Sequence, residues 1–68
     1  MKEFTNRGCG RCALLAETRG TILVARLEIE DYPFVVAGGP IEQDGSWCHG
    51  SYYCDIQAAV QEFKKRTK

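Results

Sequence analysis

The sequence has few of the residues and none of the motifs that would assign it a chemistry. It has one histidine, one tryptophan and two prolines among 68 residues. It contains no G-x-S-x-G motif, no phosphate-binding glycine loop and no paired-carboxylate motif. A lone histidine, His49, without an acidic or nucleophilic partner in such a motif is typical of a structural or solvent-facing residue. A domain of this size also has little room for a pocket that excludes water. The sequence therefore predicts a protein that is not an enzyme.

The chain also has no net charge and no long apolar run. Nine basic side chains balance nine acidic ones, whereas binding to a phosphate backbone needs clustered Lys and Arg. We therefore do not expect nucleic acid as the main partner. No segment approaches the roughly 20 apolar residues of a membrane span, and the polar start MKEFTNRGCG does not resemble a signal peptide. These features predict a cytoplasmic protein with no membrane partner.

The length predicts a single domain over residues 1–68 with a small core. A domain of this size buries only about 60% of its unfolded surface. Such chains often gain stability from a bound metal, from disulfides or from a partner subunit. From the sequence, one structural zinc ion and a homo-oligomer are therefore both kept as alternative sources of stability.

The hydrophobic pattern predicts strands first and a helix last. The expected strands are Met1–Thr5, Thr21–Asp31, Phe34–Ala37 and Ser46–Tyr53. The second has the alternation of a half-buried strand, with Leu23 and Ala25 on one face and Arg26, Glu28 and Glu30 on the other. Residues 13–18 predict one or two helical turns, and Asp44-Gly45 predicts a hairpin turn.

The C-terminal segment predicts an amphipathic helix from Ile56 to about Arg66. Asp55 is suited to cap its first turn. The apolar residues have the spacing of one buried stripe: Ile56, Ala59, Val60 and Phe63. Glu62 and Arg66 form an i, i+4 pair. The expected fold is α+β, an antiparallel sheet of three to four strands with this one helix packed on one face.

The four cysteines have three interpretations. Cys9-Gly10-Arg11-Cys12 has the spacing of two ligands to one tetrahedral zinc, and the candidates for the remaining ligands are Cys48, His49 and Cys54. If residues 47–53 form a continuous strand, Cys48 and Cys54 lie roughly 20 Å apart, so both can bind only if Gly50-Ser51 breaks the strand. Disulfides, which need an oxidising environment, and free apolar cysteines are the alternatives.

A redox or metal-carrier role for Cys9 and Cys12 is a further alternative. A C-x-x-C motif at a helix start lowers a thiol pKa and supports disulfide exchange. The thioredoxin-like form of the motif follows a strand and opens a long helix, and this pattern is missing here.

The aromatic and acidic residues suggest a binding surface. Trp47, Tyr52 and Tyr53 cluster in the last predicted strand, and such residues are enriched at protein interfaces. A period of two places Trp47 and Tyr53 on one face and Tyr52 on the other. Acidic side chains form a second candidate surface, for a basic partner: Glu28, Glu30 and Asp31, joined by Glu42 and Asp44.

The C-terminal pattern supports one resemblance. Gly50-x-Tyr52-x-x-Asp55 followed by Ala59-x-x-x-Phe63-x-x-Arg66 resembles the closing strand, cap and helix of small phage and plasmid accessory proteins, including anti-CRISPR and anti-restriction inhibitors. The resemblance covers about the last 20 residues and implies a non-enzymatic protein that binds a host complex. The leading hypothesis is thus an inhibitor or binding module that acts by protein–protein contact. The alternative is a zinc-ribbon-like module associated with nucleic acid.

Overall fold

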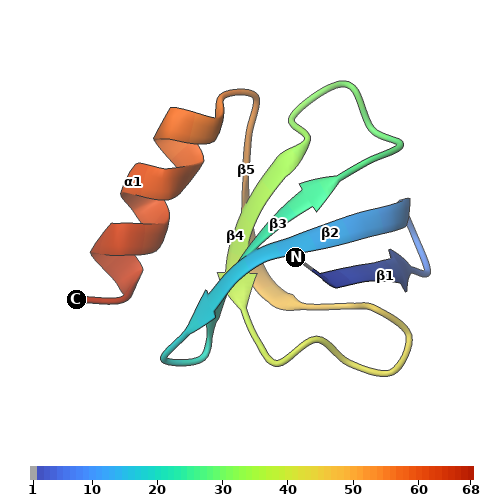
Figure 1. The fold of residues 1–68 in the computed structure, drawn as a ribbon, viewed down its shortest axis with the longest axis horizontal. Coiled ribbons are helices and arrows are strands. Elements are labelled where there is room, and N and C mark those ends of the chain that lie inside the picture. Colours follow the sequence, from blue (N-terminus) through green and yellow to red (C-terminus); the bar gives the residue numbers. More distant parts are fainter. Residues whose placement is uncertain (1) are drawn as a thin grey trace.

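The computed structural model describes residues 2–68 as one antiparallel sheet and one helix (Figure 1). The elements are β1 (Lys2–Asn6), β2 (Gly10–Thr18), β3 (Thr21–Arg26), β4 (Phe34–Gly38), β5 (Cys48–Tyr53) and α1 (Ile56–Arg66). The strands lie in chain order, and each is antiparallel to its neighbours. The expected α+β class and C-terminal helix are confirmed. The sheet has five strands rather than three or four. Met1, where the first predicted strand begins, lies outside the described residues.

The additional strand is β2, where the sequence predicted helical turns at residues 13–18. That prediction is wrong, because β2 pairs along one edge with β1 and along the other with β3. A register shift between Leu14 and Ala16 interrupts the second pairing. Ala, Leu and Glu favour a helix in isolation, but strand pairing on both sides overrides so weak a local preference.

The strand β3 is shorter and more deeply buried than its sequence pattern suggested. It ends at Arg26 rather than Asp31. Ile22 and Val24 face one core and are fully buried, while Leu23 faces the other and is 5% exposed. A central strand with side chains packed on both faces reads as a continuous apolar run. The acidic residues after Arg26 therefore lie in the β3–β4 connection.

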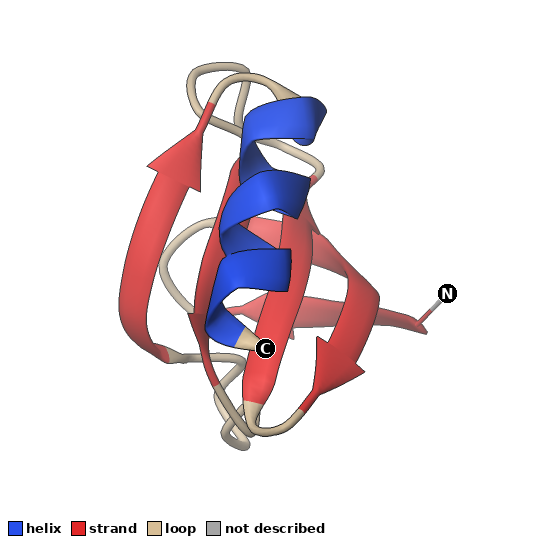
Figure 2. Ribbon diagram, turned by 90° about the vertical axis from the view of Figure 1, so that its left-hand side faces the viewer, coloured by secondary structure: helices blue, strands red, loops and turns tan. Residues whose placement is uncertain are grey.

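The two faces of the sheet carry separate hydrophobic clusters. The residues of the first are Cys12, Ile22, Val24, Val35 and Ala37, with Phe4, Cys9, Leu14, Ile41 and Trp47 packed against them. The residues of the second are Leu23, Val36 and Ala59, with Ala16, Phe34, Tyr53, Val60 and Phe63 packed against them. The helix α1 covers the second cluster and contacts β3, β4 and β5 (Figure 2).

The β4–β5 connection folds back onto β1 and closes the curled sheet over the first cluster. The Arg7 amide donates to the Asp44 carbonyl at 2.9 Å, and Asn6 Nδ2 donates to the Gly45 carbonyl at 2.7 Å. The Phe4 and Trp47 rings meet edge to face, with centroids 6.4 Å apart. Asp44-Gly45 does form a turn, as predicted, but the turn lies within this longer connection and contacts β1.

The helix is fastened at both ends. Asp55 caps it by accepting a hydrogen bond from the Gln57 amide at 3.3 Å, which confirms the predicted N-cap. Near the other end, Arg66 forms the predicted ion pair with Glu62 at 2.8 Å. Arg66 also donates to the His49 carbonyl and to Ser51 Oγ of β5.

The part of the chain from Lys2 to Lys68 holds no apolar helix of the length that a membrane crossing requires.

The capping interaction gives the first testable prediction. We expect Asp55→Ala to lower the free energy of unfolding by about 1 kcal/mol, because an amide of the first turn loses its acceptor. In a domain of this size, that corresponds to a fall of roughly 4–8 °C in Tm. Thermal denaturation followed by circular dichroism measures the change. Gln61→Ala, at an exposed helical position, is the control, and an equal loss in both variants would contradict the capping role.

Candidate functional site

The site begins with an irregularity in β5. Ser51 pairs with Val36, and Cys48 pairs with Gly38. Two residues of β5, His49 and Gly50, therefore lie opposite a single residue of β4, and His49 has a φ of 53°. This is a β-bulge, which inserts one residue and reverses the alternation of faces beyond it. Residues 48–53 thus form neither an even strand nor a broken loop.

The bulge corrects the predicted arrangement of the three aromatic residues. Trp47 and Tyr52 lie together, and Trp47 Nε1 donates to the Tyr52 hydroxyl at 3.2 Å. Tyr53, which was predicted to share a face with Trp47, packs instead against the cluster beneath the helix. A strict period of two fails here because the extra residue at the bulge lies between Trp47 and both tyrosines.

Arg26 extends the aromatic pair into a larger surface. Its guanidinium carbon lies 4.7 Å from the centroid of the Tyr52 ring, a cation–π contact. Its Nη2 donates to the carbonyls of Asp31, at 3.4 Å, and Tyr32. The same side chain therefore holds the β3–β4 connection and stacks on β5. We call Arg26, Tyr32, Trp47 and Tyr52 the aromatic surface.

Tyr32 is the most exposed large side chain of the aromatic surface. It is 56% exposed, and Tyr52 is 45% exposed. Tyr32 has a φ of 51°, a conformation that is uncommon for a bulky residue and persists only where the surroundings enforce it. The hydrogen bonds from Arg26 supply that constraint. The sequence did not predict the roles of Arg26 and Tyr32, because their contact joins a strand to the connection that follows it.

The predicted acidic residues lie in the β3–β4 and β4–β5 connections. Glu28, Glu30 and Asp31 are all exposed in the β3–β4 connection. Glu28 also accepts a hydrogen bond from the Arg11 amide at 3.2 Å. In the β4–β5 connection, hydrogen bonds from the Ser46 side chain, and then its amide, lower the pKa of Asp44. Carboxylates thus occur both in the connection that Arg26 holds and in the connection that leads to Trp47.

The structure brings together only one pair of the four cysteines. Cys9 Sγ and Cys12 Sγ lie 3.8 Å apart, whereas Cys48 and Cys54 are exposed and belong to β5 and the turn after it. Within residues 2–68, no group of three or more His, Cys, Asp or Glu side chains is arranged to hold a metal ion. Two thiolates on one tetrahedral zinc, with bonds of about 2.3 Å, lie roughly 3.8 Å apart. The pair therefore has the separation of two zinc ligands, and none of the described side chains lies beside them as a third ligand.

Cys9 and Cys12 differ in their surroundings. Cys12 is fully buried, and Cys9 is partly exposed. Burial raises the pKa of the Cys12 thiol to about 12, with further increases from the hydrogen bond and the charge of Cys9. Cys9 lines a shallow depression that also includes Arg26, Trp47 and Tyr52. The dithiol and the aromatic surface are therefore neighbours.

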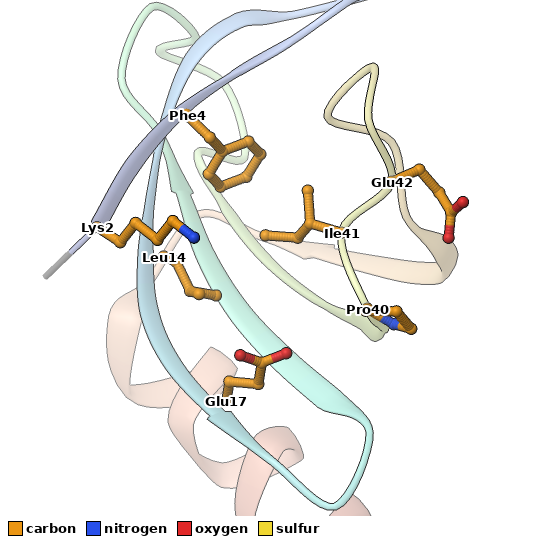
Figure 3. A pocket seen from close by; sticks show the side chains of 7 residues that line it. All are labelled: Lys2, Phe4, Leu14, Glu17, Pro40, Ile41 and Glu42. Atoms are coloured by element: carbon orange, nitrogen blue, oxygen red, sulfur yellow. The ribbon is translucent and has the colours of Figure 1, made fainter.

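A second depression lies where β1 and β2 face the start of the β4–β5 connection (Figure 3). Phe4, Leu14 and Ile41 form its apolar floor, and Lys2 and Glu17 project at its rim. It has a volume of about 320 Å³. Of the predicted binding and metal-ligating residues, it includes Glu42 of the candidate acidic surface, whereas the cysteines and the predicted aromatic residues lie elsewhere.

Comparisons with protein families, with curated proteins and with solved structures gave no match for the chain. The interpretation of the site therefore rests on its own geometry and charge.

Proposed function

We propose that the protein is a non-enzymatic binding module that acts by protein–protein contact through the aromatic surface. The observation that carries the proposal is the chain of contacts from the backbone carbonyl of Tyr32 through the side chains of Arg26 and Tyr52 to Trp47. Trp, Tyr and Arg are the residues in which interface binding energy concentrates. In this protein the side chains of Arg26, Tyr52 and Trp47 hold one another in place. This pre-positioning reduces the entropy that is lost when a partner binds.

The flanking charges indicate the kind of partner. Glu28, Glu30 and Asp31 are exposed in the connection that carries Tyr32, so a basic protein surface that presents Arg or Lys is the complementary occupant. Carboxylates at the rim of an interface mainly accelerate association and select the partner. Inhibition of a host complex, as in phage or plasmid anti-defence proteins, is the form of this function that the resemblance of residues 50–66 implies.

The aromatic surface can be tested by capture of a partner with matched baits. The test bait carries Tyr32→Gly and Tyr52→Ser, since glycine accepts the backbone conformation of position 32. The control bait carries Gln57→Ala and Gln61→Ala on the exposed side of α1. The protein captured by the native chain is identified, purified and titrated against all three. Because each aromatic anchor contributes about 2 kcal/mol, we expect the test bait to bind at least about 30-fold more weakly.

The control bait should bind as the native chain does, and affinity should fall as ionic strength rises. Equal binding by the native and test baits, with both folded by circular dichroism, would contradict the proposed surface. An acidic captured partner whose affinity is insensitive to salt would contradict the proposed partner chemistry.

A further inference from the structure

Cys9 and Cys12 have an arrangement that none of the contacts above requires. Cys9 lies in the connection between β1 and β2, where its amide donates to Asn6 Oδ1 at 3.0 Å. Cys12 lies on β2 with its thiol in the first cluster. The two sulfur atoms are 3.8 Å apart, and the only thiol of the two that reaches the surface is that of Cys9. A buried thiol directly behind a partly exposed one is the arrangement needed for disulfide exchange.

We propose that Cys9 and Cys12 form a reversible redox site that exchanges with low-molecular-weight disulfides such as oxidised glutathione. The proposal does not depend on the protein–protein function. A C-x-x-C disulfide closes a very short loop, so the entropic stabilisation that it supplies is small. Such a bond is readily reduced again, and transient disulfides of this kind are those that a reducing compartment allows.

The exchange takes place in two balanced steps. In the first, the Cys9 thiolate attacks one sulfur of the small disulfide. A mixed disulfide forms on Cys9, and the other half leaves as a thiolate that takes up a proton. In the second, Cys12 loses its proton and its thiolate attacks Cys9 Sγ, the bond between Cys9 and the small thiol breaks, and the second half leaves as a thiolate that takes up a proton. Two protein thiols are oxidised by two electrons, and one small disulfide is reduced to two thiols.

The geometry makes the second step short. A disulfide has a sulfur–sulfur bond of about 2.05 Å, so the two atoms at 3.8 Å must approach by less than about 2 Å. Cys12 is shielded from solvent, and Cys9 is therefore the sulfur that meets the small disulfide first. Once Cys9 is in a mixed disulfide, it carries no thiolate charge. Two of the causes that raise the pKa of Cys12, its hydrogen bond with Cys9 and the charge of Cys9, are then removed.

The test uses the full chain with Cys48→Ser and Cys54→Ser, because both positions are exposed and would otherwise react. The protein is freed of metal, incubated with oxidised glutathione and examined by intact mass and thiol titration. We expect the loss of two hydrogen atoms with no retained glutathione, and full recovery of both thiols on reduction. The fluorescence of Trp47, the only tryptophan, should change with oxidation, because Cys9 lines the same depression.

A matched variant that also carries Cys9→Ser should show neither the mass loss nor the fluorescence change. Two results would overturn the proposal in the folded protein. One is a stable glutathione adduct on Cys9 that Cys12 does not displace. The other is that Cys9 does not react under conditions that fully modify the exposed Cys48 in a variant that carries Cys54→Ser but keeps Cys48. A zinc ion that copurifies with the two thiols and blocks their oxidation at equimolar amounts would also overturn it, in favour of a metal site.

Discussion

Replacing Gly45 with alanine is expected to lower the free energy of unfolding by about 3 kcal/mol or more. Gly45 has a φ of 81°, and an alanine Cβ there would lie 2.6 Å from the Asn6 Cα and closer still to the Thr5 carbonyl. Both neighbours are backbone atoms of β1 and have no rotamer that would relieve the contact. The β4–β5 connection would have to move away from β1 and would break the hydrogen bond from Asn6. Chemical denaturation with urea measures the loss.

Gly20→Ala separates the steric effect from the conformational one. Gly20 has a similar φ of 74°, but nothing lies within 4 Å of its would-be Cβ. Only the conformational penalty of about 1 kcal/mol applies there. If the two variants lost equal stability, the close approach of the connection to β1 would not be a main support of the fold.

Replacing Arg26 with methionine is expected to produce the second largest effect, a loss of about 2–3 kcal/mol. Hydrogen bonds from a charged donor contribute about 1.5–3 kcal/mol, and the cation–π contact adds about 0.5–1 kcal/mol. Methionine keeps much of the aliphatic volume but offers no donor to the carbonyls of Asp31 and Tyr32. We also expect hydrogen exchange to accelerate roughly tenfold or more in residues 27–33.

The control for this prediction is Arg11→Met. Arg11 is exposed, and its ion pair with Glu3 measures 3.4 Å on the surface of β1 and β2, where such pairs contribute little. Its removal should leave exchange in residues 27–33 unchanged. Arg26→Lys should behave more like methionine than like arginine, because an ammonium cannot both reach the two carbonyls and stack flat on Tyr52. Full retention of loop protection in the lysine variant would contradict the role of the planar guanidinium.

The importance of Arg26 lies in what it joins. The β3–β4 connection carries the acidic residues and Tyr32, and β5 carries Tyr52. These segments are separate in the chain, and Arg26 contacts both. A loss of Arg26 would therefore weaken partner binding even where no partner atom touches it. In the proposed binding module it is a positioning residue, and the tyrosines and Trp47 supply the contact area.

Part of the candidate site was accessible from composition and spacing. Trp47 and Tyr52 were predicted to be binding residues because of their chemistry, and Cys9 and Cys12 were predicted to act as a pair because of their spacing. Arg26 and Tyr32 were not predicted. The contacts of Arg26 join β3 to the β3–β4 connection and to β5, and β3 and β5 do not pair with each other. The bulge at His49-Gly50 separates Tyr53 from Trp47. The periodicity of the sequence does not reveal the extra residue of the bulge, because the bulge is defined by how β5 pairs with β4.

The features that could be predicted correctly from sequence are those with local causes. The C-terminal helix, its Asp55 cap and the Glu62–Arg66 pair depend on residues within a few positions of one another, and all three appear in the structure. The other features arise from contacts between segments that are distant in the chain. The tertiary structure made residues 13–18 a strand through pairing on both edges, placed Trp47 and Tyr52 on one face, and joined two connections through Arg26. These features depend on contacts between distant segments, whose free energy outweighs the weak local preferences of the chain.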